Sequence, residues 1–165
     1  MNKSTGEVAS GLAAMMMIVG LMLVGPSTGW AQQKASSADG VKAASQAFYA
    51  ALVGTDVAAM KKVWAHTPYV AYVGPRMKTI AHGWAAVEKA LEEAFSASMS
   101  RTVSLTESHV HTDGKLAWEI GNEVGAVKLK DGKEIKIDII VTNVFEKQKG
   151  GRWLMISHHV QPKPQ

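Results

Sequence analysis

The amino-acid sequence predicts an α+β domain in which three N-terminal helices pack on a strongly curved antiparallel sheet. The first observation is that apolar residues recur every three or four positions over residues 39–95, which is the period of amphipathic helices. The second is that the period changes to two after Arg101, as in half-buried strands. The third is that Asp113-Gly114, Asp131-Gly132 and Gly150-Gly151, three strong hairpin turns, divide the second half into four segments.

Residues 1–31 have the pattern of a secretory signal peptide. An uncharged apolar run, Gly11–Gly25, ends at Pro26, and Gly29-Trp30-Ala31 offers the small residues that signal peptidase reads. The run is shorter than the roughly 20 residues of a bilayer span, although an uncleaved N-terminal anchor is the alternative. The chain contains 0 Cys, so packing rather than disulfides must hold an exported domain together. We therefore expect export to the periplasm, with no stable membrane anchor after cleavage.

The remaining part of the chain, 165 − 31 = 134 residues, is enough for one domain with one core. Its formal charge is +4, and basic and acidic residues are dispersed along the chain. Nucleic-acid binding would require a dense basic stripe, which the sequence lacks. We expect no nucleic-acid partner.

Within residues 39–162, the expected folded domain, the helical elements come first. We expect a flexible lead over 32–38 and then a helix from the N-cap Asp39 to Gly54. A second, shorter helix begins at Thr55 or Asp56 and must stop before Pro68, because the residue before proline avoids helical geometry.

A short strand over residues 69–73 can pair with residues 79–82, and Gly83 leads into the third helix. Four longer segments then read as strands: Thr102–His111, Leu116–Leu129, Glu134–Lys147 and Arg152–Gln161. Gly121 and Gly125 are natural positions for a bulge or a sharp bend. A sheet bent there, with a helix across its concave side, leaves a conical hollow.

Aromatic and imidazole side chains near the ends of these elements are the candidate site residues. His66 follows the second helix, where it can transfer protons at a cavity mouth or cap the helix. Tyr72 can donate a hydrogen bond to a ligand carbonyl or oxyanion. Trp64 and Trp84 lie on helical apolar stripes, so they belong to the core or wall the cavity.

His158 and His159 are neighbours on a strand, so at most one of them can face a given cavity. Glu119 and Glu123 share a strand face with Gly121, and desolvation would make either carboxylate a candidate general base if it pointed inward. The favoured interpretation is that they face water or Lys136. No metal site is expected, since no carboxylates or imidazoles stand at metal-binding spacing.

The order of these segments resembles the SnoaL-like branch of the nuclear transport factor two-like superfamily. The segments that carry the resemblance are Phe48–Leu52, Asp56–Met60, Val63–His66, Val73–Pro75, His82–Trp84, Leu116–Trp118, Thr142–Phe145 and Gly151–His159. The resemblance implies a cone-shaped barrel, dimerisation through the outer sheet face, and a ligand cavity at the wide end. The Asp base and the Tyr/Asp oxyanion pair of the steroid isomerases have no counterpart here, and Ser157 stands where His is frequent.

Together these observations predict an exported, homodimeric domain that binds a small apolar molecule without a cofactor. If it is an enzyme, isomerase- or cyclase-type proton transfer would use His66 or His159 as base and Tyr72 as oxyanion donor. The expected ligand-binding residues are Trp64, Trp84, Trp118, Asn143 and His158. A non-catalytic carrier or sensor of an apolar metabolite, or a dimerisation module without a ligand, is the alternative.

Overall fold

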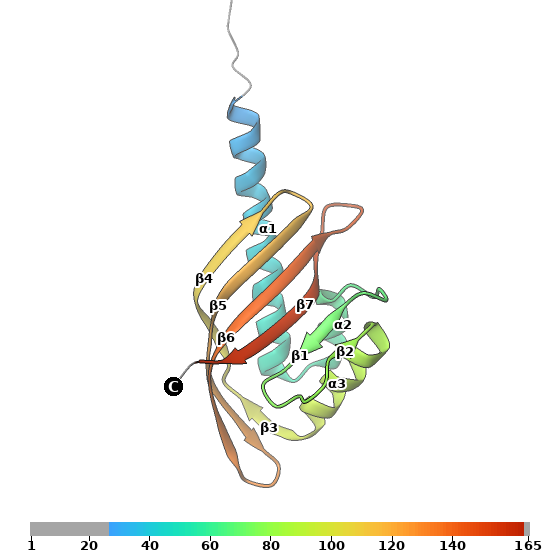
Figure 1. The fold of residues 1–165 in the computed structure, drawn as a ribbon, viewed down its shortest axis with the longest axis vertical. Coiled ribbons are helices and arrows are strands. Elements are labelled where there is room, and N and C mark those ends of the chain that lie inside the picture. Colours follow the sequence, from blue (N-terminus) through green and yellow to red (C-terminus); the bar gives the residue numbers. More distant parts are fainter. Residues whose placement is uncertain (1–26, 164–165) are drawn as a thin grey trace, which may run out of the picture.

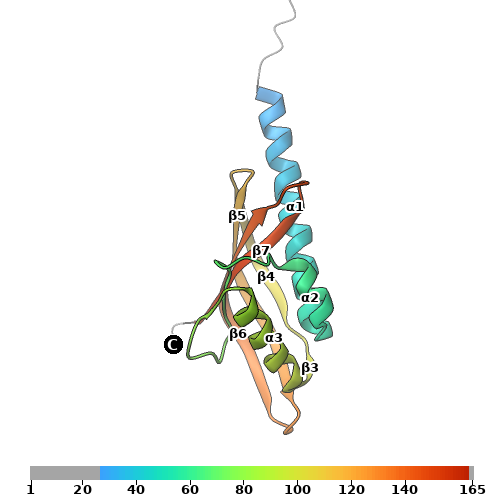
Figure 2. The ribbon, with the colours of Figure 1, turned by 90° about the vertical axis from the view of Figure 1, so that its right-hand side faces the viewer.

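The computed structural model describes the backbone of residues 27–163 and the side chains from residue 37 onward; most of the predicted signal peptide lies outside this range. Three helices pack on a curled seven-stranded sheet (Figures 1 and 2). The elements, in chain order, are α1 (Ser27–Gly54), α2 (Val57–Val63), β1 (Ala71–Val73), β2 (Ala81–His82), α3 (Trp84–Ser96), β3 (Ser98–Arg101), β4 (Ser104–Thr112), β5 (Leu116–Leu129), β6 (Glu134–Lys147) and β7 (Trp153–Pro162). The predicted α+β fold is confirmed.

The strand order is β2-β1-β7-β6-β5-β3, and β4 pairs with another part of β5. The long strands β5, β6 and β7 form the predicted antiparallel meander. The sheet is nevertheless mixed, because β1 runs parallel to β7. The sequence prediction of an antiparallel sheet missed this pair, since a three-residue strand carries little information about its partner.

Helix α1 is longer than predicted. Its backbone is helical from Ser27 and through residues 32–38, so the N-cap expected at Asp39 is wrong. Ala, Gln and Lys in this stretch have good helix propensity, and the helix continues upstream of its amphipathic part. Figure 1 shows this upstream part of α1 extending beyond the sheet.

The starts of α2 and α3 follow the predicted signals. Asp56 caps α2, where its carboxylate accepts a hydrogen bond of 2.9 Å from the backbone N–H of Ala59. In α3, Val87, Leu91 and Phe95 are buried at the helical spacing expected for a core-facing stripe. They pack against the sheet together with Phe48 of α1 and form one hydrophobic core.

The predicted strand Thr102–His111 corresponds to β4, and the strand that precedes it, β3 (Ser98–Arg101), was not predicted. Both pair with β5, but β3 pairs with its last residues and β4 with residues 117–124. The change occurs opposite Gly125, whose φ of +141° suits only glycine. A second irregularity, a shift in the β4–β5 register between Thr106 and His109, lies beside Gly121. Both predicted bending positions are confirmed, and they curl the sheet.

We predict that Gly125→Ala destabilises the protein strongly. A Cβ there would lie 2.2 Å from the carbonyl oxygen of Thr102, in addition to the cost of the positive φ. Gly132→Ala is the matched control, because its φ is +86° but no atom lies within 4 Å of the added Cβ. Urea unfolding should show a loss of about 1–2 kcal/mol for Gly132→Ala and a clearly larger loss for Gly125→Ala. Equal losses would contradict the steric argument.

Candidate ligand cavity and buried polar network

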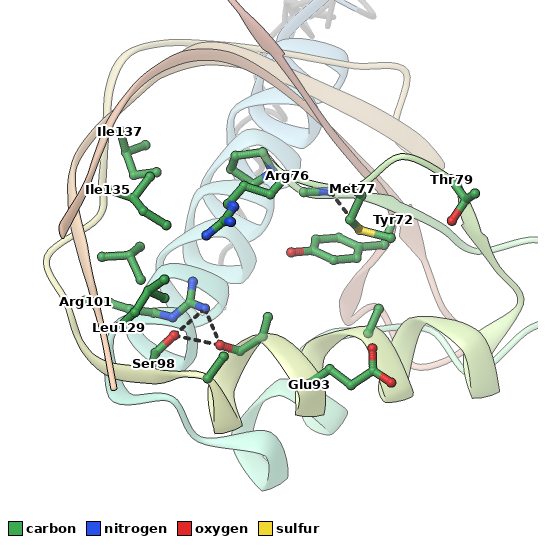
Figure 3. Close-up of a pocket in the computed structure, with 16 residues that line it drawn as sticks. Tyr72, Arg76, Met77, Thr79, Glu93, Ser98, Arg101, Leu129, Ile135 and Ile137 are labelled. Carbon is green, nitrogen blue, oxygen red and sulfur yellow. Dashed lines mark hydrogen bonds between the residues drawn. The ribbon is translucent and has the colours of Figure 1, made fainter. Parts of the chain in front are cut away.

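A cavity of about 380 Å³ opens between α3, the β1–β2 connection and the ends of β5 and β6 (Figure 3). Small-molecule sites in proteins have volumes of roughly 300–1,000 Å³. The lining residues are Tyr72, Gly74, Pro75, Arg76, Met77, Thr79, Ala90, Glu93, Ala94, Ala97, Ser98, Arg101, Val127, Leu129, Ile135 and Ile137. The cavity can therefore hold a compact small molecule.

The cavity exists because small side chains face large ones across it. The end of α3 contributes Ala90 and Ala94, and Ala97 follows as its C-cap residue. The opposite wall consists of branched side chains at alternate positions, Val127 and Leu129 of β5 with Ile135 and Ile137 of β6. Alanines do not reach far enough from the helix to fill the gap.

Tyr72 places a polar atom in this apolar space. Its ring is buried against Trp64, and its hydroxyl points into the cavity (Figure 3). Burial raises the pKa of Tyr72 to about 12, so the phenol stays protonated and can donate a hydrogen bond. Gly74 makes room for this side chain, since a Cβ there would lie 2.6 Å from the Tyr72 hydroxyl oxygen.

Arg101 contributes a charged group to the same cavity. Its Nη2 donates to the carbonyl oxygen of Ala94 at 2.8 Å and to the Ser98 hydroxyl at 2.9 Å. The guanidinium lies over the Phe95 ring, 5.2 Å from its centroid. Burial lowers the pKa of Arg101, but a guanidinium remains protonated in proteins.

Behind Tyr72, polar side chains form a buried network on the inner face of the sheet. The His158 ring stacks on Tyr72 with 5.4 Å between centroids, and its Nδ1 lies 2.8 Å from Oδ1 of Asn143. The Asn143 amide nitrogen donates to Glu119 at 3.1 Å and contacts the hydroxyl of Tyr49 at 3.4 Å. Because the amide nitrogen is committed to these acceptors, Oδ1 is the acceptor for His158, and Nδ1 carries the imidazole proton.

The two carboxyl groups of this network occupy different environments. Glu119 accepts hydrogen bonds from Ser45 at 2.6 Å and Ser108 at 2.7 Å, besides that from Asn143. Glu123 accepts one from Tyr49 at 2.8 Å, and burial raises its pKa to about 7. Burial also raises the pKa of Tyr49. The prediction that Glu119 and Glu123 face water is wrong: they are 2% and 3% exposed.

His158 and Glu123 do not form an ion pair at neutral pH, although Nε2 and Oε1 are 3.8 Å apart. Burial, with a further contribution from His159, lowers the pKa of His158 to about 3, so the imidazole is neutral. A neutral His158 gives Glu123 no positive charge to stabilise its ionised form. The raised pKa of Glu123 follows from the same burial.

A second, more open groove of about 620 Å³ lies between α1 and β4. It is lined by residues that include Lys42, Ser45, Tyr49, Leu105 and Glu119. The groove borders the Glu119 end of the buried network, whereas Tyr72 separates the His158 end from the smaller cavity.

Of the predicted catalytic residues, only Tyr72 lines the 380 Å³ cavity. His66 is exposed; its Nε2 donates to the carbonyl oxygen of Lys61 at 2.8 Å, and its ring stacks on Trp84 at 4.1 Å. It therefore caps the end of α2. His159 is exposed on the outer face of the sheet, so of the two neighbouring histidines it is His158 that points inward.

The predicted ligand-binding residues also lie elsewhere. Trp64 is fully buried, with no hydrogen-bond partner for Nε1 among the described residues. Trp118 is 44% exposed and stacks on His111 at 5.2 Å, on the outer face. Trp84, Asn143 and His158 do not line the cavity. Sequence reasoning missed Arg76, Arg101 and Tyr49, because nothing in their spacing marks them as inward-facing.

The described side chains include no group of three or more His, Cys, Asp or Glu residues that could hold a metal ion. Asp138 is exposed, and its carboxylate forms an ion pair with Lys163.

We predict that the opposed pKa shifts of Glu123 and His158 shape stability against pH. A raised carboxyl pKa gives a contribution that is full below pH 4.5 and is lost as pH rises to about 7. A lowered imidazole pKa gives a contribution to the free energy of unfolding that is full above pH 6.5 and is lost as pH falls to about 3. Between pH 4.5 and 6.5 the two slopes, each about 1.4 kcal/mol per pH unit, cancel.

Replacing either group should expose the slope of the other. Relative to the unchanged protein, His158→Gln should lose stability as pH rises from 4.5 to 6.5, and Glu123→Gln should lose it as pH falls over the same interval. Urea unfolding at pH 4.5, 5.5 and 6.5 measures both. If both variants kept the pH profile of the unchanged protein, the assigned protonation states would be wrong.

Residues 41–161 match the SnoaL-like domain family. The chain is similar in structure to a protein of the nuclear transport factor 2-like family from Streptomyces avermitilis, provisionally named a dehydratase, with 22% identity and a TM-score of 0.71 over 80% of this chain and 99% of that one. A ketosteroid isomerase-like protein from Erwinia carotovora has 17% identity and a TM-score of 0.65, over 75% and 94% of the two chains.

A nuclear transport factor 2-like superfamily protein from Salmonella enterica has 15% identity and a TM-score of 0.69, over 82% of this chain and 94% of that one. No protein of curated function matches the sequence. The structural likenesses show a shared cone-shaped fold, and the family match runs from within α1 to near the end of β7. The chain belongs to the SnoaL-like domain family.

Proposed function

We propose that this SnoaL-like domain binds a small, largely apolar molecule in the cavity between α3 and the ends of β5 and β6. The observation that carries the proposal is the unfilled volume of about 380 Å³ between the alanines of α3 and the branched side chains of the sheet. An apolar molecule of matching size would gain by removing these walls from water. Tyr72 would orient its polar atom.

The structure gives more support to ligand binding than to a reaction in which the predicted catalytic residues transfer a proton. His66 and His159 lie outside the cavity, and Tyr72, with a pKa of about 12, is a donor rather than a base at neutral pH. The dehydratase and isomerase names belong to proteins below 25% identity, and this fold hosts different activities. We therefore favour a carrier or sensor.

The same proposal includes export and self-association. The apolar run Gly11–Gly25 and the small residues after it support a secretory signal. Within the part of the chain that the structure describes, no helix is long and apolar enough to span a membrane.

A homodimer is supported by apolar side chains on the outer face of β5. Leu116, Trp118 and Ile120 are 47%, 44% and 42% exposed, and their alternation places all three on one face. A contiguous apolar patch on a soluble domain is typical of an interaction surface. A second copy of the same face would cover it through a two-fold axis.

We predict that filling the cavity abolishes binding of a neutral apolar probe. Ala90→Phe would place a ring in the space, whereas Ala85→Phe, on an exposed position of the same helix that does not line the cavity, is the matched control. Titration of N-phenyl-1-naphthylamine, followed by fluorescence, should give a loss of at least about tenfold in affinity for Ala90→Phe alone. Equal binding by both variants would place the probe elsewhere.

We predict that Ile120→Glu disrupts the dimer. A carboxylate in the middle of an apolar contact loses its hydration without gaining a partner. Ile80→Glu is the matched control, since Ile80 is 67% exposed and lies outside β5. Sedimentation velocity should show monomers for Ile120→Glu and dimers for Ile80→Glu; monomers of the unchanged protein would contradict the dimer.

A further inference from the structure

We propose that the molecule in this cavity carries a carboxylate on an apolar body, and that Arg101, assisted by Arg76 and Tyr72, binds that carboxylate. This inference rests on the proposed binding function and names the chemistry of its ligand. It comes from the charged groups of the cavity rather than from its volume.

Arg101 has donors that the protein does not use. Nη2 makes both of its hydrogen bonds, to Ala94 and Ser98, whereas Nε is buried without a partner. Among the described residues, no carboxylate lies within 4 Å of this guanidinium. A half-buried cation without an anion in contact is costly to maintain, and a ligand anion would compensate it.

Two further groups point at the same space. Figure 3 shows the Arg76 side chain reaching toward the guanidinium of Arg101, and the Tyr72 hydroxyl facing the region between them. Two guanidinium groups held near each other repel unless an anion lies between them. The phenol of Tyr72, protonated at neutral pH, adds a neutral donor.

The charge of the lining fits one negative group. Arg76 and Arg101 contribute two positive charges and Glu93 one negative charge, so the lining carries 2 − 1 = +1. Glu93 is exposed, and its carboxylate lies 3.9 Å from Lys89 on the helix surface. A planar guanidinium fork matches the two oxygens of a carboxylate.

The rest of the cavity fits the apolar body of such a molecule. Val127, Leu129, Ile135 and Ile137 form a wall without a polar side-chain atom. An inorganic anion is well hydrated in water and would gain nothing from this apolar wall. A hydrocarbon body is poorly solvated by water and would be stabilised by contact with the wall. The geometry thus favours a hydrophobic acid over an inorganic anion or a neutral hydrocarbon.

The test compares an acid with its alcohol. 4-Phenylbutanoate and 4-phenylbutan-1-ol have the same apolar body, and each is titrated against the protein loaded with N-phenyl-1-naphthylamine. We expect the acid to displace the probe at least about tenfold more tightly than the alcohol, and inorganic phosphate not to displace it. Arg101→Gln should remove this preference, and Arg101→Lys should retain part of it.

Two variants separate binding from folding. Arg76→Gln changes an exposed arginine of the cavity and should reduce the preference for the acid without loss of thermal stability. Arg152→Gln changes an exposed arginine in the β6–β7 turn, outside the cavity, and should leave the preference intact.

The outcomes distinguish this inference from the function on which it rests. If acid and alcohol displace the probe equally, the cavity binds small molecules but the arginines do not select an anion, and the inference is overturned. If the probe itself does not bind in the cavity, both proposals fail. A preference for the acid that survives in both Arg101→Gln and Arg76→Gln also overturns the inference.

Discussion

The fold depends on keeping every polar group on the inner face of β5 hydrogen-bonded. Glu119 and Glu123 alternate with small residues on the strand face that turns toward the helices. This face therefore cannot pack against the helices through large apolar side chains alone. Each buried carboxyl needs donors, because an unpartnered one would cost several kcal/mol. Ser45 and Tyr49 of α1 supply donors from one side, and Asn143 supplies them from β6. This requirement fixes α1 across the sheet.

The same network divides the interior into two regions with different chemistry. Around Asn143 and His158 lie hydrogen-bonded groups and the rings of Phe48 and Tyr72. Beyond Tyr72, the alanines of α3 leave volume unoccupied. Glu123 and His158, whose pKa values are shifted toward their neutral forms, therefore belong to the packed region. The open region contains a phenol and guanidinium groups, which keep their protons at neutral pH. This arrangement suits recognition of a ligand more than proton transfer to it.

The sequence predicted the elements well and the site poorly, for physical reasons. Periodicity and turn residues report local backbone geometry, so β5, β6 and the start of α2 were predicted within one or two residues. The division of residues 98–112 into two strands could be expected only in part, from Gly125. The cavity depends on the distance between α3 and β6, elements separated by about forty residues in the chain, and side-chain spacing does not reveal that distance.

Individual residues show the same limit. Glu123 is a charged residue at an alternating position, and its burial follows from which face of β5 meets the helices. Burial rules favour water for such a residue, so sequence reasoning placed it outside. Trp118 is the reverse case, since an aromatic ring predicted for the cavity lies on the outer face. Arg101 gave no signal at all, because an arginine after a helix is usually a surface cation.

The hydrogen bond between Asn143 and His158 has a consequence for how β7 finds its place. Successive strand residues alternate faces, so a shift by one position would bring His159 inward and turn His158 toward solvent. A histidine would still stand opposite Asn143 after such a shift. The irregularity in the β6–β7 register between Val144 and Phe145 places Trp153 and Met155 on the same face as His158, so they would then leave the core. Because either imidazole can contact Asn143, this hydrogen bond alone does not fix the register of β7. The burial of the large apolar side chains of the same strand fixes it.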